Sequence, residues 1–493
     1  MRNLTIFLLG LAVGLAGCRS SARLPDDQRT RDCDTQVRAK WGKGLDDLPR
    51  VRLDIISPHN EHIQREYAWA FSLWHAIQYG QTVEVVWRDV GGGGSTIQQY
   101  LEKTYEGGGT SDVDVLWGGG DLTFNRLLGS PHSILVPLDL AADVLDNIPQ
   151  SLHGQDFYGL KKDDQKDSGG QDRPLARRSI YWVGSALSGF GFLVNTGMMR
   201  KCRIDQPQKW EDLGDDSLTD LLVLADPGQS GSVASTYLNI VKTAPTWSEG
   251  WAKLVMVLSN AKRISDSAGA AANAPVLGDA LVASCIDFYG LMRVAEAPDE
   301  LSYVSPEGQT TFGSDPIGIL RGAPHPAIAE RFVNFVMSAQ GQALWAVRVG
   351  SEHGPVRNVL GRQPIRKDVY ATYADRLAPS IVNPYQAGMA MAVVPQMNRI
   401  NFGVFRNLVV AAAVDNTDYM RAARRRLNEL ARDPSAQDEY RRRLAIFTSL
   451  PADADAIAKM GAVADRTKDL VGQYEVARSW RDFFRHNFQE VAK

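Results

Sequence analysis

Short apolar runs alternate along this chain with segments of helical periodicity, and this alternation restricts the fold more than any other feature. Val51–His59 reads as a strand that ends in a turn, and Glu61–Ile77 carries apolar residues at helical spacing. Further strands are predicted at Val83–Trp87 and Asp114–Trp117. Strands that alternate with helices predict a parallel sheet with right-handed crossovers. Such sheets bind ligands beyond the carboxyl ends of their strands.

Small and polar residues follow three of the predicted strands. Ser57–His59 ends the first strand, Gly118–Asp121 follows the strand at 114–117, and Ser230–Ser232 follows an apolar run at Leu221–Leu224. Because all three segments fall at carboxyl ends of strands, where such sheets bind ligands, together they predict a binding cleft.

The segment Leu221–Tyr237 carries the strongest of these signals. Its apolar run is typical of a buried strand, Asp226-Pro227-Gly228 ends that strand, and Ser230–Ser232 opens a helical pattern. Free N–H groups at a helix start, with hydroxyls beside them and a glycine that permits close approach, make an anion seat. Simple N-capping by one of the serines is the alternative. The segment predicts a small, anionic solute that is held without being transformed.

The N-terminus has the features of a bacterial lipoprotein signal. Leu4–Val13 is a short apolar stretch after a positive residue, and Leu15–Cys18 resembles a lipobox. We therefore predict a signal peptide at 1–17, a lipidated Cys18 that anchors the chain to the membrane, and a polar tether at 18–49. An ordinary signal peptide with a chance cysteine is the alternative.

Composition excludes several classes of function. The net charge is −3 and no face is conspicuously basic overall, which predicts no nucleic-acid partner. No apolar run of about 18 residues follows the N-terminus, so no transmembrane helix is expected there. If Cys18 is lipidated, Cys33, Cys202 and Cys285 remain, which allows at most one disulfide and resembles no zinc site. Gly91–Gly94 lacks the lysine of a phosphate-binding loop and is predicted to be a flexible turn.

The order of the elements resembles that of extracellular solute-binding proteins of ABC importers, in the branch that includes ferric-iron receptors. The similarity covers roughly residues 50–370. It depends on four soft motifs in a specific order: Trp210-Glu211-Asp212-Leu213, Ala225-Asp226-Pro227 with Ser230-Gly231, Asp315-Pro316-Ile317-Gly318-Ile319-Leu320, and Ala329–Trp345 with Gly341-Gln342.

The resemblance implies an α/β, two-lobed periplasmic-binding-protein-like (type II) fold with a hinge. Lobe I would comprise residues 50–185 and 306–385, and lobe II residues 186–305. Residues 386–493 exceed the usual family fold and read as a helical C-terminal extension. Its arginine triplets at 424–426 and 441–443 read as solvated helix faces, with a docking surface as the alternative.

The resemblance also implies roles for single residues. Ser230, Gly231 and Ser232 match the segment that family members use for an oxyanion, and His59 falls where ferric receptors place a metal-binding histidine. Iron(III) needs hard oxygen ligands, yet the family's carboxylate position matches the glycines at 118–120, and its tyrosine pair aligns near Asp287-Phe288 with only Tyr289 following. Asp287 could pair with an ammonium group, and Tyr289 could be core. The predicted ligand-binding residues are Ser57, His59, Gly119, Ser188, Ser230, Gly231, Ser232, Asp287 and Tyr289, with no metal and no cofactor.

The predicted function is that of a substrate-binding lipoprotein in the bacterial cell envelope, which passes a small solute to an ABC transporter permease. It is not predicted to be an enzyme. Three alternatives stay open: an iron(III) receptor, a sensing or scaffold lipoprotein, and a serine hydrolase. The last would use Ser230 in Gly228-Gln229-Ser230-Gly231-Ser232, where a serine replaces the final glycine of the nucleophile elbow. Candidate solutes are phosphorylated or phosphonate compounds, sugar phosphates, carboxylates and polyamines.

Overall fold

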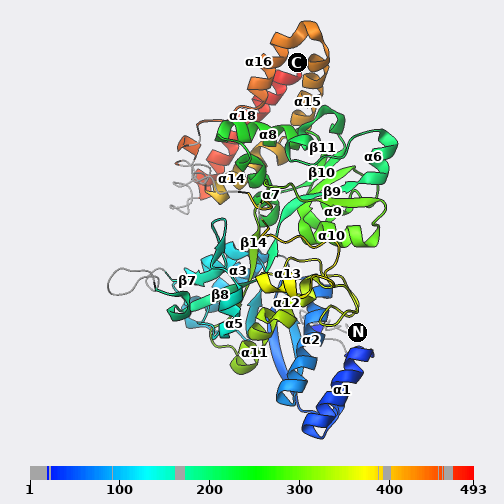
Figure 1. Ribbon diagram of the computed structural model, residues 1–493. Helices are drawn as coiled ribbons and strands as arrows, with labels where there is room; N and C mark the ends of the chain where they lie inside the picture. Colours follow the sequence, from blue (N-terminus) through cyan, green and yellow to red (C-terminus); the bar gives the residue numbers. More distant parts are fainter. Residues whose placement is uncertain are drawn as a thin grey trace, which may run out of the picture. The chain divides into compact units, whose positions relative to one another are not determined.

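The structure, a computed structural model, describes residues 19–20, 24–91, 93–161, 173–386, 388–391, 401–453, 455–457, 459 and 470–493. The chain divides into two compact units (Figure 1). Unit 1 consists of Met1–Ala141, Gly159–Val183 and Pro316–Val336, and unit 2 of Ala142–Tyr158, Gly184–Asp315 and Met337–Lys493. The predicted signal peptide and Cys18 lie outside the described residues, and the predicted lobe boundaries stay a prediction.

Most of a seven-stranded sheet belongs to unit 1. The strand order is β1 (Arg19–Ser20), β3 (Thr82–Arg88), β2 (Arg50–Ile56), β4 (Val115–Trp117), β14 (Gly313–Ile319), β8 (Ile180–Ser188) and β7 (Tyr158–Leu160). β2 pairs in parallel with both β3 and β4, as the alternating pattern predicted, whereas β14 returns antiparallel to β4. The carboxyl ends of β3, β2 and β4 therefore lie side by side.

Helices follow each of these three parallel strands in unit 1: α2 (Glu61–Tyr79), α3 (Gly94–Tyr105) and α4 (Asp121–Leu128). Asn60 caps α2 by accepting the Ile63 N–H at 3.1 Å, which fixes where the helix begins after the β2 turn. Trp117, at the end of β4, is fully buried, and its ring lies 4.7 Å from Tyr67 and 5.5 Å from Phe332 in edge contacts. The end of β4 is thus held in the core of unit 1.

Unit 2 contains a five-stranded sheet in the order β11 (Ala261–Ser265), β10 (Leu222–Ala225), β12 (Val282–Ile286), β9 (Phe190–Asn195) and β13 (Leu301–Val304). β10 is parallel to both neighbours and buried along its whole length, as its apolar run predicted. The helices after β10, β11 and β12 are α7 (Gly231–Lys242) with α8 (Trp247–Ser259), α9 (Ala268–Asn273), and α10 (Asp287–Glu296).

The C-terminal helices are part of the core of unit 2. They are α14 (Phe402–Val409), a π-helical turn at Val410–Val414, α15 (Thr417–Arg432), α16 (Gln437–Phe447) and α18 (Leu470–Ala492). α14 lies against α7, and α15 lies against α8 (Figure 1). Phe405, Leu427 and Phe484 share one buried cluster with strand β10 and Trp251 of α8. Burial of this shared apolar surface joins the helices to the sheet.

The arginines of α15 and α16 form ion pairs or are buried. Arg425 pairs with Asp220 at 2.7 Å, and Arg441 pairs with Asp438 on the same helix at 3.0 Å. Arg424 is buried and donates to the Gly214 carbonyl and the Asn260 side chain. These contacts agree with solvated or packed helix faces more than with a free basic surface.

The other α-helices and strands are α1 (Gln28–Trp41), α5 (Ala142–Asn147), β5 (Ser151–Leu152), β6 (Gln155–Asp156), α6 (Thr196–Cys202), α11 (Pro326–Met337), α12 (Ala339–Ala346) and α13 (Lys367–Thr372). Among the described residues, no helix has the length and apolar character needed to cross a bilayer. Cys33, Cys202 and Cys285 are all free thiols.

Candidate functional site

The start of α7 opens to solvent in the way that an anion seat requires. Ser230 caps the helix with its Oγ 3.5 Å from the Val233 nitrogen, a long hydrogen bond, and this Oγ also lies 3.0 Å from the Ser232 Oγ. Gly231 is exposed, and a Cβ built on it would meet no atom within 4 Å. Capping and binding therefore do not exclude each other: the hydroxyls, the first N–H groups and open space lie together.

Hydrogen bonds stabilise the turn that leads into α7. Asp226 accepts the Gly228 N–H at 2.6 Å, and the buried Tyr237 of α7 donates its hydroxyl to the Ala225 carbonyl at 2.6 Å. A Cβ on Gly228 would lie 3.2 Å from Val410, in the π-helical turn after α14. The start of α7 is thus held between the end of β10 and the C-terminal helices, while Gly231 at the start of the helix stays exposed.

In unit 1, the predicted residues Ser57 and His59 lie together after β2. The Ser57 Oγ accepts the His59 N–H at 3.1 Å and lies 3.0 Å from the ring Nδ1. The imidazole packs edge-on against Trp117 and next to Gly118, where a Cβ would lie 2.9 Å from the ring Cε1. Gly118, Gly119 and Gly120 all have positive φ, so backbone replaces side chains around His59.

Gly94, the last residue of the predicted flexible turn at Gly91–Gly94, begins helix α3, while residue 92 of that segment lies outside the described residues. A Cβ on Gly94 would lie 2.5 Å from the Gly119 carbonyl oxygen, so at this residue two backbone segments pack directly against each other. The Gly119 carbonyl also accepts the Thr123 hydroxyl at 3.0 Å. The glycine is needed for this close approach, a requirement that sequence reasoning missed because its partner lies on the next strand's loop.

Asp287 and Ser188, two other predicted residues, lie in a buried polar cluster of unit 2. Asp287 is 3% exposed and accepts the Gly189 N–H and the Phe288 N–H, each at 2.8 Å. Burial raises the pKa of Asp287 to about 7, opposed by the Gly189 N–H and the charge of Arg362. Its carboxylate oxygens are thus occupied by the protein's own donors.

Arg362 holds this cluster together, and no pattern in the sequence singled it out. It donates to the Ser188 Oγ at 2.6 Å and forms an ion pair with Asp315 in β14. Its guanidinium lies over the rings of Phe288, at 4.9 Å, and Trp345, at 5.3 Å. A lone arginine outside the helices and strands carries no periodicity and no motif, so only the folded chain brings it to these partners.

Tyr289 lies in the hydrophobic cluster of Leu193, Cys285 and Leu301. Burial raises the pKa of its phenol. These contacts agree with the core role that was the alternative for this residue.

One group in the described part of the chain has the geometry of a metal site: Asp54, Asp114 and His325, in unit 1. Its oxygens already have donors. Arg52 binds both oxygens of Asp54, at 2.7 and 2.6 Å, while Asp114 accepts the N–H groups of Asp54 and His325 and lies 3.0 Å from the His325 ring. An ion would have to displace these hydrogen bonds, so the group joins β2, β4 and α11 rather than offering free ligands.

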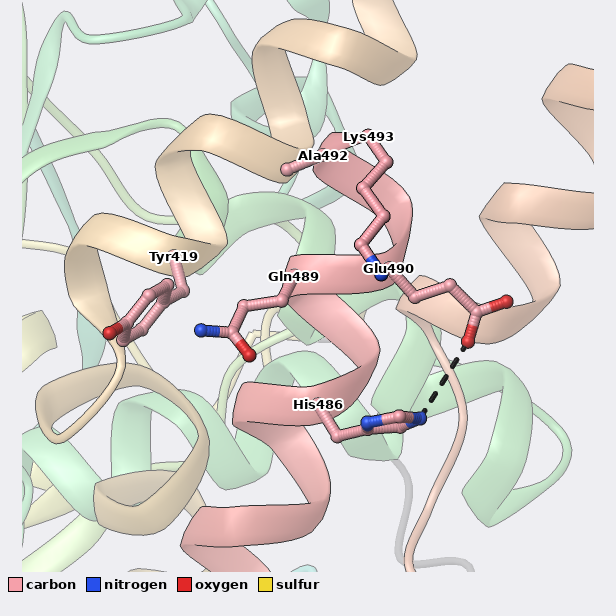
Figure 2. Close-up of a pocket in the computed structure, with 6 residues that line it drawn as sticks. All are labelled: Tyr419, His486, Gln489, Glu490, Ala492 and Lys493. Carbon is pink, nitrogen blue, oxygen red and sulfur yellow. Dashed lines mark ion pairs between the residues drawn. The ribbon is translucent and has the colours of Figure 1, made fainter.

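A hollow of about 650 Å³ lies on the C-terminal helices, where α15 and α18 meet (Figure 2). It is lined by Tyr419, His486, Gln489, Glu490, Ala492 and Lys493. His486 and Glu490 lie 3.8 Å apart on one face of α18, and Figure 2 shows both side chains directed along the helix surface. None of the predicted site residues lines this hollow.

The hydrolase alternative requires a histidine beside Ser230, and within unit 2 the described contacts do not provide one. The histidine His353 directs its Nδ1 to the Tyr373 hydroxyl at 3.1 Å, and His486 faces Glu490. The described partners of the Ser230 Oγ are Ser232 and the Val233 N–H. This arrangement can accept or donate hydrogen bonds to a ligand, and among the described residues of unit 2 no histidine is hydrogen-bonded to the Ser230 Oγ as an activating base would be.

Comparison by sequence identifies a class of protein. Residues 162–360 match the family described as bacterial extracellular solute-binding protein. The chain is also similar to the phosphoglycerate transport regulatory proteins PgtC of Salmonella typhimurium and Salmonella typhi, each 25% identical over 232 residues, which cover 45% of this chain and 56% of the relative. The chain thus spans little more than half the length of these curated relatives.

Comparison by structure identifies the fold. The periplasmic binding protein AfuA from Actinobacillus pleuropneumoniae, solved with exogenous fructose-6-phosphate bound, has a TM-score of 0.50 and 16% identity, covering 75% of this chain and 96% of that one. The apo ferric ion-binding protein A from Pasteurella haemolytica has a TM-score of 0.50 and 13% identity, covering 73% and 96%. At these identities the likeness shows the fold alone.

The predicted resemblance and fold class are confirmed. Residues 162–360 match the family of bacterial extracellular solute-binding proteins, and the chain has the two-lobed α/β type II fold of periplasmic binding proteins with a helical C-terminal region. The matched family is one of binding proteins.

Proposed function

We propose that this chain is the solute-binding component of an ABC importer, which captures a small anionic solute outside the cytoplasm and delivers it to a membrane permease. The observation that carries the proposal is the start of the 12-residue helix α7, where two hydroxyls 3.0 Å apart lie beside an exposed Gly231 at which a Cβ would meet no atom within 4 Å. A helix start of this kind favours anions through the helix dipole and its unpaired N–H groups.

The solute class that we propose is a phosphorylated organic acid or sugar. A phosphate offers three acceptor oxygens, which suit a site made of hydroxyl and N–H donors. Two relatives support this class by what their names and titles state: phosphoglycerate for the curated proteins and fructose-6-phosphate for one solved structure. Ser57, His59 and Gly119, which belong to unit 1, stay proposed ligand-binding residues.

Anchoring through Cys18 belongs to the same proposal. A lipid on Cys18 followed by a polar tether would keep the binding domain near its permease. Metabolic labelling with a radioactive or clickable fatty acid tests this point: incorporation that is lost in Cys18→Ser is expected, whereas a secreted, unlabelled wild-type protein would contradict the anchor.

A screen of thermal stability tests the choice of solute. Inorganic phosphate, 3-phosphoglycerate, fructose 6-phosphate, citrate and spermidine would each be added to the purified chain, since a ligand that binds only the folded form raises the melting temperature. We expect the phosphorylated compounds to raise it and spermidine to leave it unchanged. Stabilisation by spermidine alone would contradict an anion seat, and recovery of an altered compound after incubation would contradict a pure binding role.

A second candidate is a sensing lipoprotein, favoured by one observation: the curated relatives are named transport regulatory proteins. In this role the chain binds the same solute but reports it to a regulatory partner instead of a permease. Uptake of radiolabelled solute by cells that lack the chain separates the two roles. Loss of an importer component abolishes uptake under every growth condition, whereas loss of a sensor changes only the induction of uptake.

A further inference from the structure

The C-terminal helices of unit 2 are interrupted between α14 and α15 by the π-helical turn at Val410–Val414. Its wide ring closes where the Asp415 N–H donates to the Val410 carbonyl, five residues back, at 3.0 Å. Single turns of this kind are rare and are frequent at functional sites. A functional reason for the irregular backbone is therefore sought in what the turn contacts.

Val410, the first residue of the π-helical turn, packs against the turn Asp226–Gly228 that leads into α7. A Cβ built on Gly228 would lie 3.2 Å from the Val410 Cγ2, so this methyl group lies directly beside the Gly228 backbone. Two residues later Ser230 caps α7, and its Oγ lies 3.0 Å from that of Ser232. A shift of the Gly228 backbone would therefore move the hydroxyls of the proposed anion site at the start of α7.

The beginning of the turn Asp226–Gly228 is held by the sheet and by α7. The Asp226 N–H donates to the Ser265 carbonyl of β11 at 2.8 Å, and the Tyr237 hydroxyl donates to the Ala225 carbonyl at 2.6 Å. The end of this turn, which leads to the serines, instead has the apolar contact with Val410. The turn thus depends on the sheet at its beginning and on the C-terminal helices at its end.

Asn416 fixes the π-helical turn on α18. Its side chain is 1% exposed, and its amide group donates to the Ala411 carbonyl in the turn at 2.8 Å and to the Arg481 carbonyl of α18 at 2.9 Å. Its Oδ1 accepts a hydrogen bond from Arg485 of α18 at 3.3 Å. Because a buried amide with three partners has little freedom to move, the π-helical turn is held in one place relative to α18.

We propose that the π-helical turn positions the anion site, with Val410 as the positioning residue that acts through Gly228. The C-terminal helices are then a working part of solute binding rather than an appended module. A turn that is already held when the solute arrives lowers the entropic cost of ordering the Ser230 and Ser232 hydroxyls on an anion. The effect on affinity rests on the proposed function, whereas the effect on the turn does not.

Hydrogen exchange of the intact chain tests the positioning without any solute. Val410→Ala removes the methyl groups beside Gly228, so the Gly228 N–H, which donates to Asp226 at 2.6 Å, should exchange roughly threefold faster or more as the turn opens more often. Val476→Ala is the matched control, because Val476 is a half-buried valine of α18 that packs against the core of unit 2. No acceleration in Val410→Ala, or the same acceleration in both variants, would overturn the proposal.

Calorimetry with inorganic phosphate and with 3-phosphoglycerate extends the test to binding. We expect Val410→Ala to weaken the affinity roughly fivefold, a typical size for coupling between separate parts of a protein, and Val476→Ala to leave it unchanged. An equal loss in both variants would indicate a merely structural role and contradict the positioning. If neither compound binds the wild-type chain while Gly228 exchange still responds to Val410→Ala, the proposed anion site fails and the positioning of the turn stands.

A double-mutant cycle tests whether Val410 acts through Gly228. Gly228→Ala places a Cβ 3.2 Å from the Val410 Cγ2, which should weaken binding by crowding the turn, and Val410→Ala makes room for this methyl group. The double variant should therefore lose less affinity than the product of the two single losses, since changes at residues in contact are not additive. Losses that simply multiply would contradict this route from the C-terminal helices to the anion site. If Gly228→Ala does not fold, the exchange of Gly228 in Val410→Ala decides.

Discussion

The start of α7 and the Arg362 cluster both lie in unit 2 and both gather polar groups, but they differ in what satisfies those groups. At α7, Ser230 and Ser232 contact each other beside an exposed Gly231. In the cluster, Arg362, Asp287 and Asp315 are buried and bonded to one another or to the backbone. Exposed polar groups can form hydrogen bonds with a ligand, whereas buried groups that are already hydrogen-bonded fix the position of the chain.

The largest expected effect tests the buried half of this comparison. Arg362→Leu leaves two buried carboxyl groups without their cation, which should cost about 3–5 kcal/mol of unfolding free energy. Arg441→Leu is the control, because its ion pair with Asp438 is largely exposed and should contribute less than about 1 kcal/mol. Urea unfolding measures both. Equal losses would mean that the cluster is not the positioning element that its burial indicates.

The next effect concerns pH. The pKa of Asp287 is raised to about 7 in the folded chain, above its ordinary value of 3.8, so the folded state holds the proton more tightly than the unfolded state. The contribution of Asp287 to stability is therefore fully present below about pH 4 and is lost as the pH rises through 7. The melting temperature of Asp287→Asn relative to wild type should rise from pH 5 to about pH 7 and level off above that pH. A constant difference would refute the raised pKa.

A glycine pair tests the packing around His59 in unit 1. Gly118 and Gly120 both have positive φ, but only a Cβ at 118 meets the His59 ring, at 2.9 Å. Gly118→Ala should therefore lose about 1–3 kcal/mol more stability than Gly120→Ala, since both carry the backbone strain and only the first displaces the imidazole. If thermal unfolding gives the same loss for both, His59 is not held by the glycines.

The smallest effect on stability is expected where the effect on binding is greatest. Ser230→Ala with Ser232→Ala should cost about 1 kcal/mol of stability, the usual value of an N-cap, while weakening phosphate binding by roughly tenfold or more. Ser235→Ala on the same helix is the control and should leave affinity unchanged, as measured by calorimetry. Unchanged affinity in the double variant would contradict an anion site at the start of α7. Loss of folding would instead mean that these serines stabilise the fold, as the Arg362 cluster does.

The sequence predicted the elements that local pattern controls. The strands at 51–56, 83–87 and 115–117 have the predicted parallel pairing, and the segment from Leu222 to Lys242 forms the predicted strand, turn and capped helix. Apolar runs, helical spacing and capping residues report on neighbours within a few positions, so one sequence is sufficient to find them. The order of these elements was also sufficient to predict the family and the fold class.

Tertiary structure decided which distant residues meet. The contact between Gly94 and Gly119, the reach of Arg362 to Ser188 and Asp315, and the shared core of the C-terminal helices with β10 all join segments far apart in the chain. Hydrophobic burial has no direction, and a lone arginine or glycine carries no periodic signal, so the sequence could not name these partners. It determined where polar groups end a strand or begin a helix; only the packed chain decided which of them are already satisfied and which remain open to a solute.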